Sequence, residues 1–144
     1  GIRDYLLDVA QFCGDDGTPR QQMQAVFDRF EQHENRLAEQ LLSYLPSKPR
    51  VKIIGMQQIE QTYQGLNLKR VPTISFVKQA TDSESIVRHI DQYGIGIRFG
   101  DFYAKHLIQT LDLEKHRGVV RVSIAHYNTE QDISRLITHL DEVL

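Results

Sequence analysis

Arg121 is the residue of this sequence whose type and position best suit chemistry on a ligand. It lies in the middle of the apolar run 119–124, in which valine or isoleucine occupies positions 120, 122 and 124. Because side chains alternate across a strand, we expect Arg121 to point to the face opposite this row. An unpaired guanidinium is costly to bury, so that face must offer water or an anion. The planar fork suits bidentate capture of a carboxylate; the alternative is a structural salt bridge to a neighbouring helix.

Other patterns that carry catalytic chemistry are missing. The sequence has no G-x-G-x-x-G, no P-loop and no G-x-S-x-G motif. Cys13 lies on the apolar stripe of the first predicted helix, which favours buried packing over a nucleophilic role. The histidines have neither an H-E-x-x-H spacing nor a cysteine partner, so we expect surface or helix-face roles and no metal site. They are His33, His89, His106, His116, His126 and His139.

Composition and charge are those of an ordinary globular chain. Its 144 residues make about one domain, with 40% hydrophobic and 25% charged residues. The net charge of −2, with 17 basic residues scattered among 19 acidic ones, disfavours a surface for nucleic acid or anionic membrane. No apolar run reaches the roughly 20 residues that span a bilayer. The single cysteine excludes an internal disulfide and favours a reducing compartment, so we expect a cytoplasmic protein.

Hydrophobic periodicity predicts the elements that must hold Arg121 in place. Helical spacing covers the segments 2–13, 18–45, 81–94, 102–113 and 129–143. Short β-branched runs predict strands at 51–55, 73–77, 95–98 and 119–124, while 56–69 is polar and typical of a loop. Strands and helices are mixed without strict βαβ alternation. This pattern favours an α+β fold, with a small, mostly antiparallel sheet covered by helices on one face.

Three of these helices begin with the signature of a capping box, in which a threonine is followed three residues later by an acidic or amide side chain. The pairs are Thr18 with Gln21, Thr81 with Glu84, and Thr129 with Asp132. Pro19 strengthens the first of them, because proline at the first helical position is already restricted to a helical φ.

Two segments carry a family signature. Residues 94–104 read G-I-G-I-R-F-G-D-F-Y-A, and residues 118–129 read G-V-V-R-V-S-I-A-H-Y-N-T. In this order they resemble the C-terminal domain of the cysteine-desulfurase-like class V aminotransferases, which depend on pyridoxal phosphate. Residues 70–76, R-V-P-T-I-S-F, are similar to an upstream strand of that domain. The resemblance implies an aminotransferase C-terminal-domain fold over the whole chain, and it is densest from 70 to 139.

The resemblance implies substrate-binding roles for three residues. Arg121 matches the arginine that salt-bridges the α-carboxylate of an amino-acid substrate, in agreement with the strand-face argument. Arg98 matches an arginine beside the catalytic loop, and a surface position at a strand end is the alternative. Tyr103 stands where the closest desulfurases carry the persulfide-forming cysteine, and a phenol cannot accept sulfur. The helical spacing of Tyr103, Leu107 and Leu111 predicts packing for the tyrosine ring, while Asn128 and Thr129 match a helix cap.

The resemblance also implies that part of the enzyme lies elsewhere. The Schiff-base lysine of the family follows Ser-x-His in the large domain, and no lysine here has that context. The chain opens with Gly1 and not with Met. We therefore expect residues 1–144 to be the C-terminal small domain of a larger homodimeric enzyme, with no catalysis by itself and no catalytic residue of its own. Pyridoxal phosphate is expected in the full-length parent, and no cofactor bound to this chain.

The resemblance implies that the chain is one part of a pyridoxal-phosphate enzyme that acts on an amino acid. By family it is similar to a cysteine desulfurase or selenocysteine lyase, but it lacks the loop cysteine. Racemase, β-lyase and aminotransferase reactions stay open, so the parent is a transferase or a lyase in expectation. The alternative is a non-catalytic, partner-binding or regulatory domain.

Overall fold

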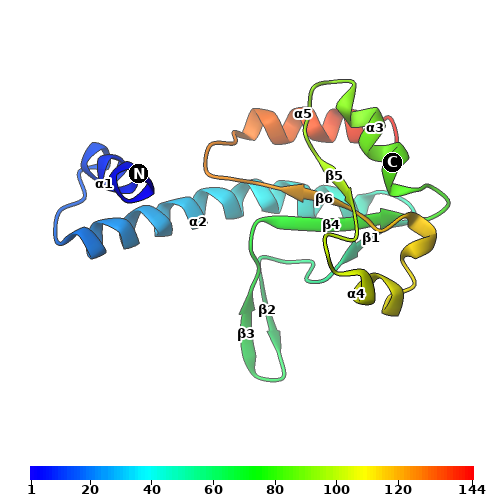
Figure 1. Ribbon diagram of the computed structural model, residues 1–144, viewed down its shortest axis with the longest axis horizontal. Coiled ribbons are helices and arrows are strands. Elements are labelled where there is room, and N and C mark those ends of the chain that lie inside the picture. Colours follow the sequence, from blue (N-terminus) through cyan, green and yellow to red (C-terminus); the bar gives the residue numbers. More distant parts are fainter.

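β-Branched and aromatic residues build a four-stranded antiparallel sheet in the centre of the chain (Figure 1). The computed structural model describes residues 1–144. The strand order is β1-β4-β6-β5, formed by β1 (Val51–Ile54), β4 (Thr73–Lys78), β6 (Val119–Ser123) and β5 (Arg98–Gly100). The helices are α1 (Ile2–Cys13), α2 (Pro19–Tyr44), α3 (Ser83–Asp91), α4 (Lys105–Thr110) and α5 (Glu130–Leu140), with 3-10 turns at Leu45–Ser47 and Glu114–His116.

The main core lies between one face of this sheet and three helices. The C-terminal half of α2, together with α3 and α5, buries side chains such as Leu41, Ile90 and Leu136 against Phe76 and Val120. On the opposite face, α4 covers only one end of the sheet, where Ile108 packs in a small cluster with Val77 and Val119. The predicted α+β architecture is therefore confirmed. The rest of the second face is open, because Ser75 and Arg121 are only half-buried there and Arg98 is exposed.

Local capping chemistry sets where the helices begin. Thr18 and Thr129 are N-caps whose hydroxyl groups accept from the backbone N–H groups of Gln21 and Asp132, as predicted. The third predicted cap is wrong by one residue. Asp82, not Thr81, is the N-cap of α3, and its carboxylate accepts from the backbone N–H of Ser85 at 2.9 Å. Aspartate is as good an N-cap as threonine, so neighbouring candidates compete closely.

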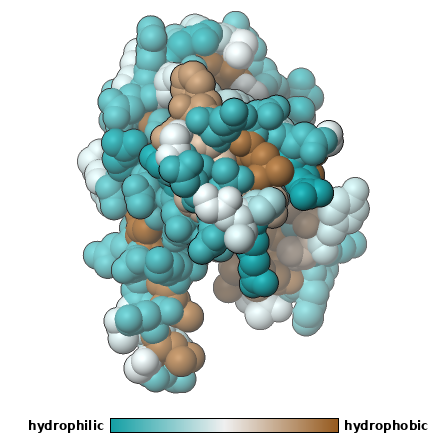
Figure 2. Space-filling model, turned by 90° about the vertical axis from the view of Figure 1, so that its left-hand side faces the viewer, coloured by the Kyte–Doolittle hydropathy of each residue, from teal (hydrophilic) through white to brown (hydrophobic).

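Residues 56–69, predicted as loop, contain a β-hairpin. Strand β2 (Glu60–Tyr63) pairs with β3 (Leu66–Lys69), and the turn residues Gln64 and Gly65 both have positive φ, at 49° and 79°. This is the backbone geometry of a two-residue hairpin turn. All eight strand residues are exposed, so no buried face imposes an alternation that the sequence would display. The hairpin projects from the sheet, and Figure 2 shows apolar side chains along it.

Arg70 ties the base of this hairpin to the sheet. Its guanidinium donates to the backbone carbonyls of Met56 and Thr73, the latter at 2.7 Å. Partial burial lowers the pKa of this guanidinium. Arg70 thus has a structural role in the segment that carried part of the family signature.

The segment 94–113 is less regular than predicted. The strand expected at 95–98 begins at Arg98, and the helix expected from residue 102 begins at Lys105. The third helix also stops at Asp91, ahead of the predicted end at Gly94. The cause of the later helix start is a turn in which Phe102 and Tyr103 have positive φ values of 50° and 64°. Left-handed backbone is costly for large L-residues, so no propensity rule points to it.

Cys13 is exposed, and the prediction that it is buried is wrong. Helix α1 packs on the N-terminal half of α2, at one end of the molecule (Figure 1), where Leu6 and Ala10 are buried against Val26. This contact covers only a narrow side of α1, and Phe12 is 93% exposed. None of the helices combines the length and apolar content that a membrane span requires.

Glu142 links the end of α5 to α3. Its carboxylate accepts from the Tyr93 hydroxyl at 2.7 Å and lies 2.9 Å from Nδ1 of His139 and 3.3 Å from Nε2 of His89. The hydrogen bond from Tyr93, followed by that from His139, holds the pKa of Glu142 below its usual value of 4.5. The link is therefore strongest when this carboxylate is ionised.

We expect Glu142→Gln to destabilise the chain at neutral pH and to lose this effect in acid. A carboxyl group with a lowered pKa in the folded state stabilises fully above its unfolded pKa, and this contribution disappears as pH falls through the folded-state value. Urea midpoints of wild type and variant, measured at pH 7 and at stepwise lower pH, should converge as the pH falls through the lowered pKa of Glu142. Glu39→Gln, at an exposed carboxylate without a partner, is the control. A difference that is constant with pH would contradict the role of the ionised carboxylate.

Candidate functional site

Two arginines lie directly opposite each other on the open face of the sheet. Arg121 of β6 pairs in register with Arg98 of β5 on one side and with Ser75 of β4 on the other. The alternation predicted for β6 is confirmed, because Val120 and Val122 are buried in the main core while Arg121 faces away from it. Like charges opposite each other on antiparallel strands repel, so an anion between them relieves the repulsion.

Arg121 has no acidic partner in the chain. It is half-buried, its Nε is fully buried without a hydrogen-bond partner, and no carboxylate lies within salt-bridge distance. The structural salt bridge considered as its alternative role is therefore not formed within these residues. A partly desolvated guanidinium without a hydrogen-bond partner costs free energy unless a ligand accepts its hydrogen bonds. Arg98 is exposed and likewise has no ion pair.

The turn 100–104 brings an aromatic ring onto Arg121. The guanidinium carbon of Arg121 lies 3.6 Å from the ring centroid of Phe102, which is within cation–π range. Sequence reasoning missed Phe102, and the Gly100-Asp101 pair was the only turn signal beside it. The backbone N–H of Tyr103 donates to Oδ1 of Asp101 at 3.1 Å and so stabilises the turn.

Tyr103 does not pack on the helix that follows it. The spacing with Leu107 and Leu111 predicted a packed ring, but this side chain is fully exposed, because Tyr103 lies in the positive-φ turn and α4 begins only at Lys105. It stands on the same turn as Phe102 and follows the strand of Arg98 directly. The structure thus gathers Arg98, Arg121 and the 100–104 turn at one end of β5 and β6.

Gly118 allows β6 to pass close to this turn. It has φ of 84°, and a Cβ added there would overlap the backbone carbonyl of Gly100. Its own carbonyl accepts from the buried Ser83 hydroxyl at 3.2 Å. The close approach fixes β5 against β6 and hence the relation of the two arginines.

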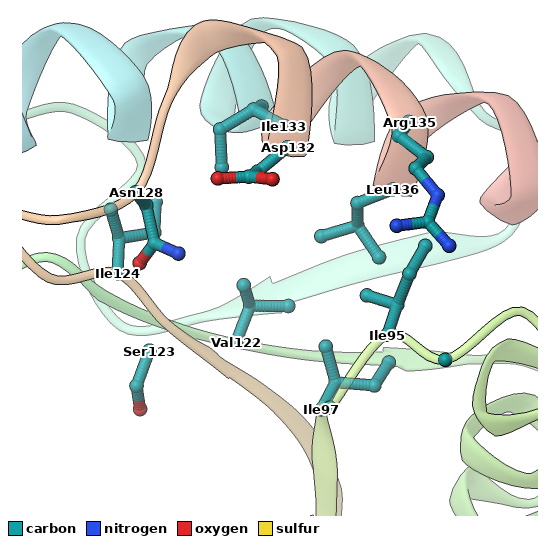
Figure 3. Close-up of a pocket in the computed structure, with 12 residues that line it drawn as sticks. Ile95, Ile97, Val122, Ser123, Ile124, Asn128, Asp132, Ile133, Arg135 and Leu136 are labelled. Carbon is teal, nitrogen blue, oxygen red and sulfur yellow. The ribbon is translucent and has the colours of Figure 1, made fainter.

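A cavity of about 200 Å³ lies on the other side of β6, between residues 94–97 and α5 (Figure 3). Six of its 12 lining residues are isoleucine, valine or leucine, and three of its polar side chains have partners in the chain. Asn128 accepts from the backbone N–H of Ala125, Asp132 accepts from that of Thr129, and Arg135 donates to the Tyr93 carbonyl. The predicted capping role of Thr129 is confirmed. The hydrogen bonds of Asn128 and Asp132 stabilise the start of α5.

His126 and His33 have their partners elsewhere in the chain and not at the arginine site. His126 stacks on Phe30 at 4.0 Å between centroids and shares a hydrogen bond with the Tyr5 hydroxyl, which fastens α1 to the loop after β6. His33 contacts the carbonyl of Asn128 at 2.8 Å. No three histidine, cysteine, aspartate or glutamate side chains are placed to hold a metal ion.

A family profile and several known proteins match the sequence of this chain. The profile of the family described as Aminotransferase class-V matches residues 20–136. An aminotransferase-like protein of Gibberella zeae is 34% identical over 120 residues, which are 83% of this chain and 28% of that protein. A probable cysteine desulfurase of Pseudomonas putida is 30% identical over 112 residues, which are 78% of this chain and 24% of that protein.

A solved structure supports the same fold. The cysteine desulfurase CsdA of Escherichia coli superposes with a TM-score of 0.63 at 21% identity, covering 86% of this chain and 28% of the other. The chain therefore spans about a quarter of the length of these relatives. The family profile covers most of the sequence, including both arginines and the turn between them. This chain belongs to the class V aminotransferase family.

Proposed function

We propose that the chain is the C-terminal, small domain of a pyridoxal-phosphate-dependent enzyme that acts on an amino acid, and that Arg121 binds the α-carboxylate of the substrate. The observation that carries this proposal is the half-buried guanidinium of Arg121, which has no carboxylate partner and lies opposite a second unpaired arginine. The chain matches about a quarter of its relatives' length, which supports the assignment to one domain of a larger protein.

The donor set of this chain suits the substrate and not the cofactor. Cofactors of this type require a lysine, and none here follows Ser-x-His. Four of the six lysines have partners in the chain: Lys48 with Asp141, Lys69 with Glu31, Lys78 with the Val143 carbonyl, and Lys115 with Asp112. We therefore assign the cofactor to the rest of the enzyme. When bound, pyridoxal phosphate supplies the electron sink for bond breaking at the amino acid.

Within this arrangement Arg121 anchors and Arg98 assists. The two terminal N–H edges of a guanidinium match the two oxygens of a carboxylate, so a bidentate pair fixes both the position and the plane of the substrate's carboxylate. Fixing that group also fixes the direction of the bonds at Cα, which is how a binding residue favours reaction. Arg98, across the strand pair, adds positive potential at the same place.

Tyr103 argues against sulfur transfer through an enzyme persulfide. It occupies the loop position at which the desulfurases that this segment resembles have their cysteine, and a phenol does not take up sulfur. The one cysteine, Cys13, lies on α1 at the other end of the molecule (Figure 1). Racemisation, β-elimination and transamination of an amino acid are compatible with the same anchor, because each needs only the oriented Cα bonds.

We expect no persulfide on this domain when the full-length enzyme turns over cysteine. Mass spectrometry of the 1–144 region after incubation with L-cysteine, together with sulfide release under reductant, checks this. Cys13→Ser is the control for adventitious modification, because Cys13 is exposed. A persulfide on Cys13 that forms at the rate of turnover, and whose loss in Cys13→Ser abolishes sulfide release, would overturn the assignment.

The proposed function itself is tested with a panel of amino acids. The full-length enzyme, loaded with pyridoxal phosphate, is mixed with each proteinogenic amino acid in both enantiomers, and the cofactor absorbance is followed. We expect a response to at least one of them and a much weaker response to the corresponding amine, which lacks the carboxylate. Equal responses to an amino acid and its amine would refute carboxylate recognition.

A further inference from the structure

The ring of Phe102 contacts both Arg121 and an apolar cluster. The ring packs against the cluster of Val77, Ile108, Leu113 and Val119, and the guanidinium carbon of Arg121 lies 3.6 Å from the ring centroid. The side chain is half-buried. The ring of Phe102 is therefore held by packing while its face contacts the guanidinium of Arg121.

The backbone adopts an unfavourable conformation at the position that carries this ring. Phe102 and Tyr103 follow each other with φ of 50° and 64°, a conformation that costs about 1 kcal/mol or more for each L-residue. Asp101 accepts the backbone N–H of Tyr103 and offsets part of this cost. Strain of this kind persists only where the surroundings require it, and it is common at ligand sites.

A ring under the guanidinium affects what Arg121 can bind. A guanidinium that stacks on an aromatic face keeps its in-plane N–H edges free, so the terminal nitrogens can still donate to two carboxylate oxygens. The ring also restrains the long side chain, whose rotamer freedom would otherwise be lost when the substrate binds. Nε, which has no protein partner, stays sheltered in this arrangement.

We propose that Phe102 is a positioning residue, which holds the Arg121 guanidinium by a cation–π contact in the orientation that receives the substrate carboxylate. The proposal rests on the proposed function of Arg121 and deepens it. The strained turn after β5 thus serves to place an aromatic platform, in addition to joining β5 to α4.

The kinetic test uses Phe102→Leu and Phe102→Tyr in the full-length enzyme, with the amino acid that gives the largest absorbance response in the panel above. Leucine keeps apolar volume without a ring, and tyrosine keeps the ring. We expect Phe102→Leu to raise KM about 3- to 10-fold with a smaller change in kcat, as the loss of one cation–π contact implies, and Phe102→Tyr to restore it. In the Arg121→Ala background, Phe102→Leu should have no further effect on KM.

A merely structural role predicts another pattern. Fewer folded molecules would lower the apparent kcat and leave KM unchanged, and Phe102→Leu would act equally with and without Arg121. Either result would overturn the proposal. If Arg121→Ala impairs the enzyme but Phe102→Leu leaves KM unchanged, then Phe102 is not a positioning residue. The assignment of Arg121 to the substrate carboxylate is unaffected by that result.

A second readout needs no activity. In ¹⁵N-edited spectra of the 144-residue chain, the Nε–H signal of Arg121 is identified by its loss in Arg121→Lys. We expect the ring of Phe102 to shift this signal upfield of the other arginine Nε–H signals. The shift should vanish in Phe102→Leu and remain in Phe102→Tyr. An Arg121 signal that is not displaced in the wild type, or that Phe102→Leu does not move, would show that the ring does not hold the guanidinium.

Discussion

Arg121→Ala in the full-length enzyme should lower kcat/KM for the best amino-acid substrate at least about tenfold and leave the cofactor bound. Removing one partner of a desolvated charge pair costs roughly 2–5 kcal/mol, because the substrate carboxylate is left without its anchor. Arg121→Lys should recover little of the loss, since an ammonium cannot reproduce the bidentate fork. Steady-state kinetics and the visible spectrum of the bound cofactor measure the two parts of this prediction.

A matched control separates this effect from a general loss of positive charge. Arg36 is exposed on α2 and has no ion pair, so Arg36→Ala should leave kcat/KM unchanged. If Arg121→Ala also leaves kcat/KM unchanged, the carboxylate assignment is wrong, and the orphaned guanidinium has to be explained by a contact with the rest of the enzyme.

Gly118→Ala should destabilise the chain by about 2–4 kcal/mol, because the new methyl group meets the Gly100 carbonyl and the position has a left-handed φ. Neither conflict can be relieved by a side-chain rotation, since the obstacle is backbone. Urea unfolding of the 144-residue chain measures the change. Gly96→Ala is the control, because nothing lies within 4 Å of a Cβ there and its φ is not positive.

The same pair of variants tests how the arginine site is held. If Gly118→Ala unfolds at the same urea concentration as Gly96→Ala, then β5 is not locked against β6 at Gly100 and the facing of Arg98 and Arg121 is not rigid. A variant of Gly118 that does not fold while the Gly96 variant does would agree with the prediction.

Sequence reasoning succeeded where one face of an element is buried. In β6 the alternation of Val120 and Val122 with Arg121 and Ser123 placed Arg121 on the correct face, since burial imposes period two on a half-buried strand. The caps at Thr18 and Thr129 were found for a similar reason, because their side chains satisfy neighbouring N–H groups and the signal is local.

The features that sequence reasoning missed depend mostly on contacts between distant parts of the chain. That Arg98 faces Arg121 is a matter of strand register, which no local pattern contains. Phe102 was missed because a phenylalanine in left-handed backbone contradicts propensity and is held there by its packing. The β2–β3 hairpin has no buried face and so lacks the periodicity on which strand prediction relies.

The two apolar clusters along α2 have a consequence for how the chain unfolds. At 26 residues, α2 is about 39 Å long, and only its C-terminal half lies in the main core. Its N-terminal half is held by the few side chains it shares with α1, of which Leu6, Ala10 and Val26 are buried, and by the stacking of Phe30 on His126. We expect such a unit to open at a lower free energy than the sheet, so amide hydrogens in α1 and the first turns of α2 should exchange with solvent through local unfolding. We therefore expect α2 to join two cooperative units of unequal stability, with the arginine pair in the more protected one.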